Sequence, residues 1–271
     1  MLILGYLGAL ATGVSLGLIG GGGSILIVPV LVYLFSTSPS LATAYSLFVV
    51  GAASLVGAYG YHKRGLIDYK TAAVFAVPSF IGVFAARTLI VPNLPEVMGS
   101  LGPFTITKDG LIMVVFASVM LVAAVSMIKK GKSKTNETDD STEETGDEPS
   151  FNYKMIGLEG LGVGALTGFV GAGGGFLIIP ALVLLAKLPM KLAVGTSLLI
   201  ISVKSLLGFM GDLTVAQTID WPTLLSVTGA AMAGIFIGAR LSKIVPGHKL
   251  KPAFGWFVLV MGVYILGRQL I

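Results

Sequence analysis

The chain has 271 residues, of which 55% are hydrophobic and 11% are charged, against about 25% charged residues in a soluble globular domain. This composition excludes an ordinary water-soluble protein and favours one that folds in a lipid bilayer. The formal net charge of +5 does not indicate nucleic-acid binding, because the Lys and Arg residues lie between the hydrophobic stretches, where membrane topology places them.

Eight hydrophobic stretches approach the length that crosses the hydrocarbon of a bilayer, which is about twenty apolar residues. Each is predicted to be a helix, because lipid offers the backbone no other hydrogen-bond partners. The stretches are 2–19, 41–60, 68–90, 110–128, 155–170, 192–211, 221–239 and 252–270. No basic segment precedes the first stretch, so we expect it to belong to the folded protein rather than to a cleaved signal. The predicted fold class is an all-α integral membrane protein.

The first stretch ends at four successive glycines, which are Gly20, Gly21, Gly22 and Gly23. A glycine in a helix interior costs about 1 kcal/mol relative to alanine, so the helix should break there. Ser24 follows at an N-cap position, and 24–36 is predicted to be a short helix that returns through the membrane. A helix that begins inside the membrane presents unpaired N–H groups and the positive end of its dipole, which together attract an anion.

The next two stretches carry further candidate residues. In 41–60, Thr43 and Ser46 offer hydroxyl groups to an anion, although isolated hydroxyls in membrane helices more often bond to their own backbone. In 68–90, Arg87 lies near the end of the predicted helix. There the sequence is consistent both with anchoring at the membrane surface and with a role as a gate.

Residues 129–152 separate the hydrophobic stretches into two groups. This segment runs from several lysines into an acidic block rich in Ser and Thr, and such a composition predicts a disordered linker because it cannot bury a core. The chain therefore divides into an N-terminal membrane unit (1–128), a charged linker (129–152) and a C-terminal membrane unit (153–271).

The second group of stretches also begins with a helix that ends in glycines. Glu159, one turn into 155–170, is a candidate carrier of a coupling proton, although an acidic residue near the membrane surface is commonplace. After this stretch a short helix over 175–187 is predicted to open at the second glycine cluster. The candidate anion-binding glycines of this half are Gly171, Gly173, Gly174 and Gly175.

Lys204 is the one full charge well inside a hydrophobic stretch, near the middle of 192–211. A cation at that depth is costly and usually marks a transport pathway. At helical spacing Lys204 shares a face with Ser197, and Thr196 lies on its flank, so these groups are suited to line an anion site. The alternative is that Lys204 snorkels to the surface or pairs with Asp212, two turns further on.

The two groups of stretches are related in sequence. A shift of 151 residues, without gaps, lays 17–60 on 168–211 with 18 identities in 44 positions. The shift pairs the glycine clusters with each other. Small residues at every fourth position ahead of each cluster predict close packing between helices in lipid.

The positions of the basic residues predict the orientation of the chain, because short loops rich in Lys and Arg stay in the cytoplasm. Such clusters follow 41–60, open the linker and surround Arg240, for which anchoring and gating are again both open. With these clusters inside, 41–60 runs inward and 192–211 runs outward. The halves are then inverted, each with about four long helices and one short helix after its glycine cluster. Both termini are predicted to lie outside, and the linker and basic loops in the cytoplasm.

Inverted repeats with interrupted helices are how many secondary transporters build a binding site near the bilayer midplane. Transport is therefore the predicted function. The alternative is that the repeat records a gene duplication and that the glycines serve close packing alone. An enzyme is not predicted, because both histidines, His62 and His248, lie at loops, and the sequence shows neither paired buried carboxylates nor metal-ligand spacing. No cysteine is present, which excludes a thiolate site, and no cofactor is expected.

The duplicated motifs resemble those of a known family. The glycine-rich break is followed in each half by a short apolar helix and a proline, and then by Ala-Thr-Ala-Tyr-Ser-Leu (42–47) or Ala-Val-Gly-Thr-Ser-Leu (193–198). This pattern resembles the TauE/SafE family, and the resemblance covers nearly the whole chain outside the linker. It implies a permease of the cytoplasmic membrane for sulfite, thiosulfate, organosulfonates or similar anions, with a proton as a candidate coupling ion.

The sequence thus predicts a permease that works by alternating access, with a small anion and the lipid bilayer as its partners. An anion-selective channel, or a carrier of a different small anion such as a carboxylate, is the alternative. The direction of transport and the oligomeric state, a homo-oligomer included, stay open at this stage.

Overall fold

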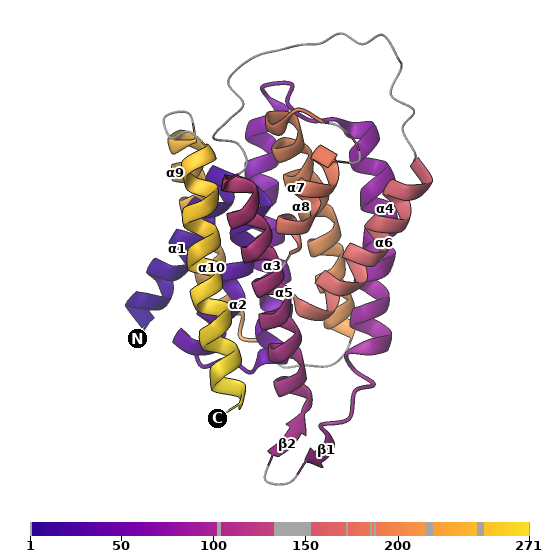
Figure 1. The fold of residues 1–271 in the computed structure, drawn as a ribbon, viewed down its shortest axis with the longest axis vertical. Helices are drawn as coiled ribbons and strands as arrows, with labels where there is room; N and C mark the ends of the chain where they lie inside the picture. Colours follow the sequence, from indigo (N-terminus) through magenta and orange to yellow (C-terminus); the bar gives the residue numbers. More distant parts are fainter. Residues whose placement is uncertain are drawn as a thin grey trace.

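The computed structural model describes residues 2–101, 104–132, 153–171, 173–184, 186, 188–214, 219–242 and 247–270. Residues 133–152, which make up most of the predicted linker, lie outside the described residues. Within the described ranges the chain forms an elongated bundle of helices with one small β-hairpin at its end (Figure 1).

Every predicted stretch forms a helix, and a short helix follows each glycine cluster. The first half contains α1 (Leu2–Ile19), the 3₁₀ helix η1 (Gly21–Leu26), α2 (Ile27–Leu34), α3 (Pro39–His62), α4 (Tyr69–Ala85), the π-helical turn η2 (Ala86–Ile90) and α5 (Lys108–Lys132). The second half contains α6 (Tyr153–Val170), α7 (Gly175–Leu184), α8 (Met190–Thr214), α9 (Trp221–Leu241) and α10 (Gly247–Leu270). Six helices of the described chain are long and apolar enough to cross a membrane, so the prediction of an all-α integral membrane protein is confirmed.

A β-hairpin ahead of α5 is an element that the sequence analysis did not predict. Its strands, β1 (Val97–Leu101) and β2 (Phe104–Thr107), pair antiparallel. Phe104 to Thr107 alternate apolar side chains with threonine, which is the period of a strand. The hairpin projects from the lower end of the bundle (Figure 1) and supplies none of the candidate residues.

Glycine seams hold the bundle together at equivalent places in the two halves. A Cβ added to Gly13 of α1 would lie 2.0 Å from the carbonyl oxygen of Ala231 in α9, and one added to Gly164 of α6 would lie 2.1 Å from that of Ser79 in α4. At such short separations the two helices touch backbone to backbone. Small residues permit this close approach between helices in lipid. The spacing of small residues in the sequence predicts both seams.

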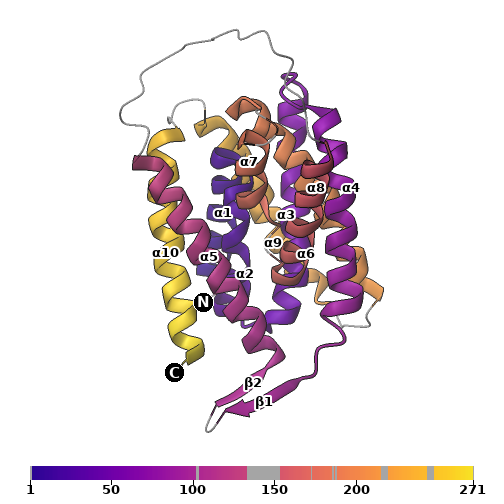
Figure 2. The same cartoon turned by 45° about the vertical axis from the view of Figure 1, so that its right-hand side comes forward.

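When the two halves are exchanged, each packed pair of helices maps onto another packed pair or onto itself. α1 packs on α9 and α4 packs on α6, while α3 packs on α8 in the centre and α5 on α10 at the side. α5 rises along the bundle where α10 descends (Figure 2), so this pair is antiparallel. An inverted repeat predicts this arrangement.

The connections divide between the two ends of the bundle. The turn from α3 to α4, the end of α5, the start of α6 and the end of α9 lie at the upper end in Figure 1. Both termini lie in the lower half of the same view. Lys63, Arg64 and Arg240, which contribute to the basic clusters, are exposed and belong to segments at the upper end.

Candidate functional site

The first glycine break interrupts the chain inside the bundle, as predicted. α1 ends at Ile19, Gly20 adopts a positive φ of 74°, and the chain continues in η1 before α2 begins at Ile27. The prediction that Ser24 caps the short helix is wrong. Ser24 lies within η1, and its hydroxyl donates to the carbonyl oxygen of Gly21 at 2.8 Å. The glycines form part of the tight 3₁₀ helix, so the α-helix begins only at Ile27. Ser24 therefore lies before the position where a cap would act.

The second glycine break is sharper than the first. α6 ends at Val170, and three of the following glycines have positive φ, at 73° for Gly171, 63° for Gly173 and 69° for Gly174. α7 then begins directly at Gly175. The carbonyl oxygen of Gly174 accepts the N–H groups of Leu177 and Ile178. The interruption is again where the sequence predicts it.

The two breaks meet in the interior of the bundle, backbone against backbone. A Cβ built on Gly21 would lie 2.1 Å from the Cα of Gly175, and a Cβ built on Gly175 would lie 2.0 Å from the Cα of Gly21. Real Cβ atoms are never found at such distances, so a side chain at either position must push the two halves apart. The start of α7 therefore lies against the first turn of η1.

Each break also packs against the central helix of the other half. A Cβ on Gly20 would lie 2.9 Å from Val194 of α8, and a Cβ on Gly171 would lie 2.3 Å from Thr43 of α3. These two contacts correspond to each other under the 151-residue repeat. The breaks and the two central helices thus form one cluster, which brings together candidate residues from both halves.

Lys204 places its ammonium group at the second break. The side chain is fully buried, and Nζ donates to Oγ1 of Thr167 at 2.8 Å. A Cβ on Gly174 would lie 2.7 Å from Nζ, so the charge sits directly beside the glycine that precedes α7. Among the described residues no acidic side chain lies within ion-pair distance of Lys204. The alternative pairing of Lys204 with Asp212 is wrong, because Asp212 binds a different cation.

The hydroxyl groups predicted to line the site fall into three kinds. Thr43 and Ser197 donate to carbonyl oxygens of their own helices, at 2.7 Å and 2.8 Å. Thr196 accepts the backbone N–H of Asp68 at 2.9 Å. Ser46 is buried, and its hydroxyl has no partner among the described residues. All four side chains are fully buried.

A pair of contacts that the sequence analysis did not predict ties each half to the other. The backbone N–H of Asp68, just before α4, donates to Thr196 of α8. Correspondingly, the backbone N–H of Asp220, just before α9, donates to the hydroxyl of Tyr45 in α3. The carboxylates of Asp68 and Asp220 cap the helices that follow. The repeated Ile-Asp-aromatic sequence at 67–69 and 219–221 is the signal for these ties.

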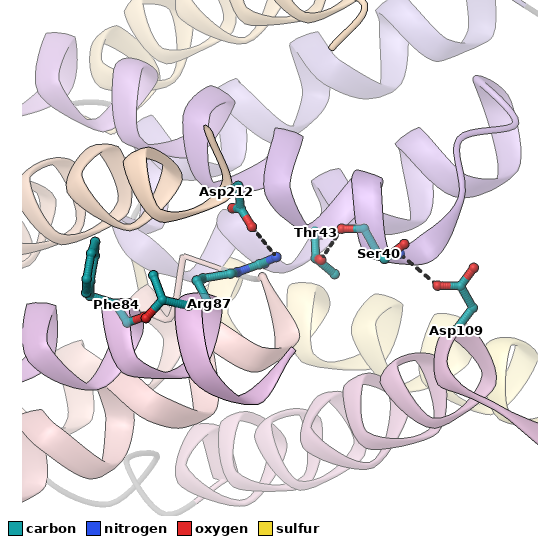
Figure 3. A network of polar contacts seen from close by, with 7 residues as sticks. Ser40, Thr43, Phe84, Arg87, Asp109 and Asp212 are labelled. Carbon is teal, nitrogen blue, oxygen red and sulfur yellow. Dashed lines mark hydrogen bonds and ion pairs between the residues drawn. The ribbon is translucent and has the colours of Figure 1, made fainter. Parts of the chain in front are cut away.

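The two arginines proposed as gates differ in environment. Arg87 is only 1% exposed and donates from Nη1 to Oδ1 of Asp212 at 3.3 Å (Figure 3). Anchoring at the membrane surface is therefore the wrong interpretation for Arg87. Arg240 is exposed in the last turn of α9, which fits an anchor. Arg87 lies in the π-helical turn η2 at Ala86–Ile90, which follows α4, and its side chain is buried in the interior.

Glu159 and an apolar surface groove both lie away from the glycine breaks. Glu159 is half-buried in α6, twelve residues before Gly171 and thus roughly 18 Å away along the helix axis. A groove of about 580 Å³ opens beside Leu55, Tyr59 and Phe236, which are exposed apolar side chains. Such a lining suits lipid chains rather than an anion. The structure therefore does not bring Glu159 to the candidate site.

Comparisons with known proteins agree with the fold. The sequence model of one family, described as sulfite exporter TauE/SafE, matches residues 5–265. A probable membrane transporter protein of Xylella fastidiosa is 29% identical over 264 residues, which cover 95% of this chain and 92% of the relative. The probable membrane transporter protein YunE of Bacillus subtilis is 28% identical, over 99% of this chain and 96% of the relative. No solved structure matches the chain.

Proposed function

Because this chain belongs to the TauE/SafE family of membrane transporters, we propose that it is a secondary permease for small anions. Sulfite, thiosulfate and organosulfonates are the proposed substrates. The family description and the names of the relatives support transport across a membrane. The proposed chemistry of the substrate rests on the residues at the two glycine breaks.

The observation that carries the proposal is the position of the Lys204 ammonium beside the backbone start of α7. Nζ lies next to Gly174 and is held by Thr167, while α7 begins at Gly175 inside the bundle. The N-terminal N–H groups of a helix and its positive dipole end favour an anion. A buried ammonium adds a full charge, which an anionic substrate would neutralise. The proposed site comprises Gly20 to Gly23, Ser24, Thr43, Ser46, Gly171, Gly173, Gly174, Gly175, Thr196, Ser197 and Lys204.

Alternating access is the proposed mechanism. The candidate residues are buried, and the breaks touch through Gly21 and Gly175. An anion can reach such a site only if the halves separate toward one end at a time. The two halves pack through equivalent seams, and inverted halves of this kind rock about a central site in many carriers. We further propose that the end with the basic turns faces the cytoplasm of a cell whose inner membrane holds the protein, and that both termini lie outside.

The test is an uptake experiment with purified protein in liposomes. Sulfite, thiosulfate, sulfoacetate, sulfate and a carboxylate are offered in turn, each with and without an imposed pH gradient. A saturable flux of one or more sulfur oxyanions is expected, and a dependence on the pH gradient would identify a proton as the coupling ion. Glu159→Gln would then show whether that residue carries the proton.

Two results would contradict the proposal. Transport of the carboxylate with no flux of any sulfur oxyanion would reject the proposed substrate class. Single-channel currents in a planar bilayer, at rates far above the turnover of a carrier, would replace alternating access with an anion channel.

A further inference from the structure

An ion pair in the interior joins the two halves at the lower end of the bundle, opposite the end that carries Lys63, Arg64 and Arg240. Arg87 comes from η2 at the end of α4, and Asp212 lies near the end of α8. In Figure 3 the Arg87 side chain points toward Asp212, and Thr43 in the first turns of α3 lies beyond it. Thr43 packs on Gly171, so a path from this end to the second glycine break would pass the ion pair.

The pair is incompletely bonded. A single contact of 3.3 Å joins Nη1 to Oδ1, which is longer than the 2.7–2.9 Å of a strong guanidinium–carboxylate bond and lacks its paired geometry. Nε and Nη2 of Arg87 and Oδ2 of Asp212 are buried without a partner among the described residues. A guanidinium that is 1% exposed is costly to desolvate, and one weak contact compensates little of that cost. The free donors of Arg87 are therefore available to another anion.

The backbone around Arg87 departs from α-helical geometry. Ala86–Ile90 forms a π-helical turn, and the N–H of Val91 donates to the carbonyl oxygen of Ala86 at 2.8 Å. Turns of this kind inside α-helices occur frequently at functional sites. Gly211 leaves room for the side chain, since a Cβ there would lie 3.3 Å from the Cβ of Arg87.

We propose that Arg87 and Asp212 form the outer gate of the anion path. In the closed gate the Asp212 carboxylate is bonded to the Arg87 guanidinium, and the transported anion replaces this carboxylate when the gate opens. This inference rests on the proposed function and adds Arg87 to it as a second cationic group that binds the anion. Lys204 lies eight residues before Asp212 in α8, roughly 12 Å along the helix axis. An anion would thus exchange places with the Asp212 carboxylate at Arg87 and then pass to the Lys204 ammonium.

A purely structural ion pair makes a different prediction. If Arg87 and Asp212 only hold the halves together, loss of either partner leaves a buried unpaired charge, and both losses harm the protein alike. In a gate the two partners are unequal. Without Asp212 the gate loosens while Arg87 still binds the anion. Without Arg87 the gate also loosens, and the anion loses the guanidinium that binds it.

Access to the interior can be measured directly, because the chain contains no cysteine. Ser46→Cys and Ser54→Cys place single reporters on α3 at two fully buried positions, eight residues apart along the same helix. A membrane-impermeant thiol reagent is applied from the side of the termini. In the Asp212→Asn background the labelling rate at position 46 is expected to rise roughly tenfold. Position 54, nearer the basic turn, should stay protected and serves as the matched control.

Transport is measured in the same variants, without the reporters, using radiolabelled sulfite and thiosulfate. Asp212→Asn is expected to keep net flux or to increase it, with a substrate leak down the concentration gradient. Arg87→Gln should reduce flux by roughly tenfold or more, the loss that follows removal of a charged hydrogen-bond donor from an anion. Arg87→Lys, which keeps the charge but not the planar donors, should fall between them. Gel filtration in detergent establishes that each variant is folded.

Unchanged labelling at position 46 in Asp212→Asn, or equal loss of flux in Asp212→Asn and Arg87→Gln, would overturn the gate. Should Asp212→Asn fail to fold, Asp212→Glu supplies the same labelling comparison, with partial opening expected. The labelling arm needs no substrate. If the parent protein moved neither anion, the proposed function would fail while the gate would still be tested. If Lys204→Ala abolished flux but Arg87→Gln did not, the gate would fail and the proposed function would stand.

Discussion

The two glycine breaks occupy equivalent places in the repeat, yet they differ in shape and in charge. The first has one positive φ, at Gly20, and passes through six residues of 3₁₀ helix before α2. The second has three positive φ values and turns directly into α7. Beside the second break lies Lys204 with its partner Thr167. The equivalent positions in the first half are Ala53 and Leu16.

The two halves thus share equivalent packing contacts but differ in the polar groups beside their breaks. The contacts of each break with the opposite central helix and the two glycine seams occur as related pairs, and Gly21 meets Gly175 between the breaks. Among the described residues, only Lys204 places a fully buried ammonium beside a break. A bound anion is therefore expected on the side of the second break, with the first break serving as its opposing wall.

The largest expected effect comes from breaking the contact that the two halves share. Gly175→Ala and Gly21→Ala would each place a Cβ about 2 Å from the backbone of the opposite break. Overpacking of a side chain commonly costs about 1–3 kcal/mol, and a backbone neighbour that cannot rotate away should raise the cost above that range. Thermal unfolding in detergent measures it. Because the contact is mutual, the two variants should be destabilised similarly.

Gly60→Ala is the matched control for these variants. Gly60 also lies inside a helix, α3, but a Cβ there would meet nothing within 4 Å. Alanine favours the helix by about 1 kcal/mol over glycine, so this variant should be as stable as the parent or slightly more so. Gly175→Ala protein with parental stability and parental transport would contradict the proposed contact between the breaks.

The second effect tests the charge that distinguishes the breaks. Lys204→Ala should reduce anion flux roughly a hundredfold, the loss expected for a fully buried charged contact with the substrate, while leaving membrane insertion intact. Lys191→Ala removes an exposed lysine from the same helix and should leave flux unchanged. The measurement is initial uptake of sulfite and thiosulfate into liposomes with matched protein content.

A transposed charge sharpens the comparison. In the double variant Ala53→Lys with Lys204→Ala, the ammonium moves to the equivalent place in the first half. There it meets Leu16 in place of Thr167, and Ala53 is fully buried. Flux should not recover, because the new charge has no hydroxyl partner. Recovery to the parental rate would show that the two breaks are chemically interchangeable.

The sequence predicts the parts of this fold that follow from periodicity and composition. Long apolar runs define the helices, and glycine clusters define the breaks, because four glycines in a row, or four within five residues, cannot favour an α-helix. Small residues at every fourth position predict the seams, as Gly13 and Gly164 illustrate. The interior position of Lys204 follows from its place in the middle of an apolar stretch.

The sequence does not predict which polar groups meet across the bundle. Asp212 lies two turns from Lys204 in α8, which favours a pairing between them on one helix. In the structure Arg87 reaches Asp212 from the π-helical turn that follows α4, on another helix. Ser24 fails as a cap because 3₁₀ geometry over the glycines moves the helix start. Both residues lie in local departures from α-helical geometry that composition does not record.

A smaller effect tests the partner of Lys204. Thr167→Val removes the hydroxyl that holds Nζ at 2.8 Å, and a hydrogen bond to a charged group contributes about 1.5–3 kcal/mol. Anion flux should fall about tenfold, chiefly through a higher KM, because the ammonium remains but is no longer held in place. Thr12→Val is the control from the first half. Thr12 is buried in α1, and its hydroxyl donates to a backbone carbonyl of its own helix, so flux should be unaffected. Equal losses in both variants would contradict a specific role for Thr167.

The smallest expected effect compares the two helix caps. The carboxylate of Asp68 accepts the N–H groups of Lys70 and Thr71, at 3.0 Å and 3.1 Å. That of Asp220 accepts the N–H of Thr223 at the longer distance of 3.3 Å. Removal of a cap costs about 0.5–2 kcal/mol. We therefore expect Asp68→Ala near the upper end of this range and Asp220→Ala near the lower end, both measured by thermal unfolding in detergent.

These two substitutions leave the ties between the halves in place, because the ties use the backbone N–H groups of positions 68 and 220. Anion flux should consequently stay close to the parental value in both variants, although stability falls. Thr196→Val removes the tie at the first position and leaves its cap intact, so it separates the two contributions. If Asp220→Ala proved more destabilising than Asp68→Ala, the shorter hydrogen bonds of the Asp68 cap would not make it the more stabilising of the two. The equivalence of the halves would then extend further than their hydrogen bonds indicate.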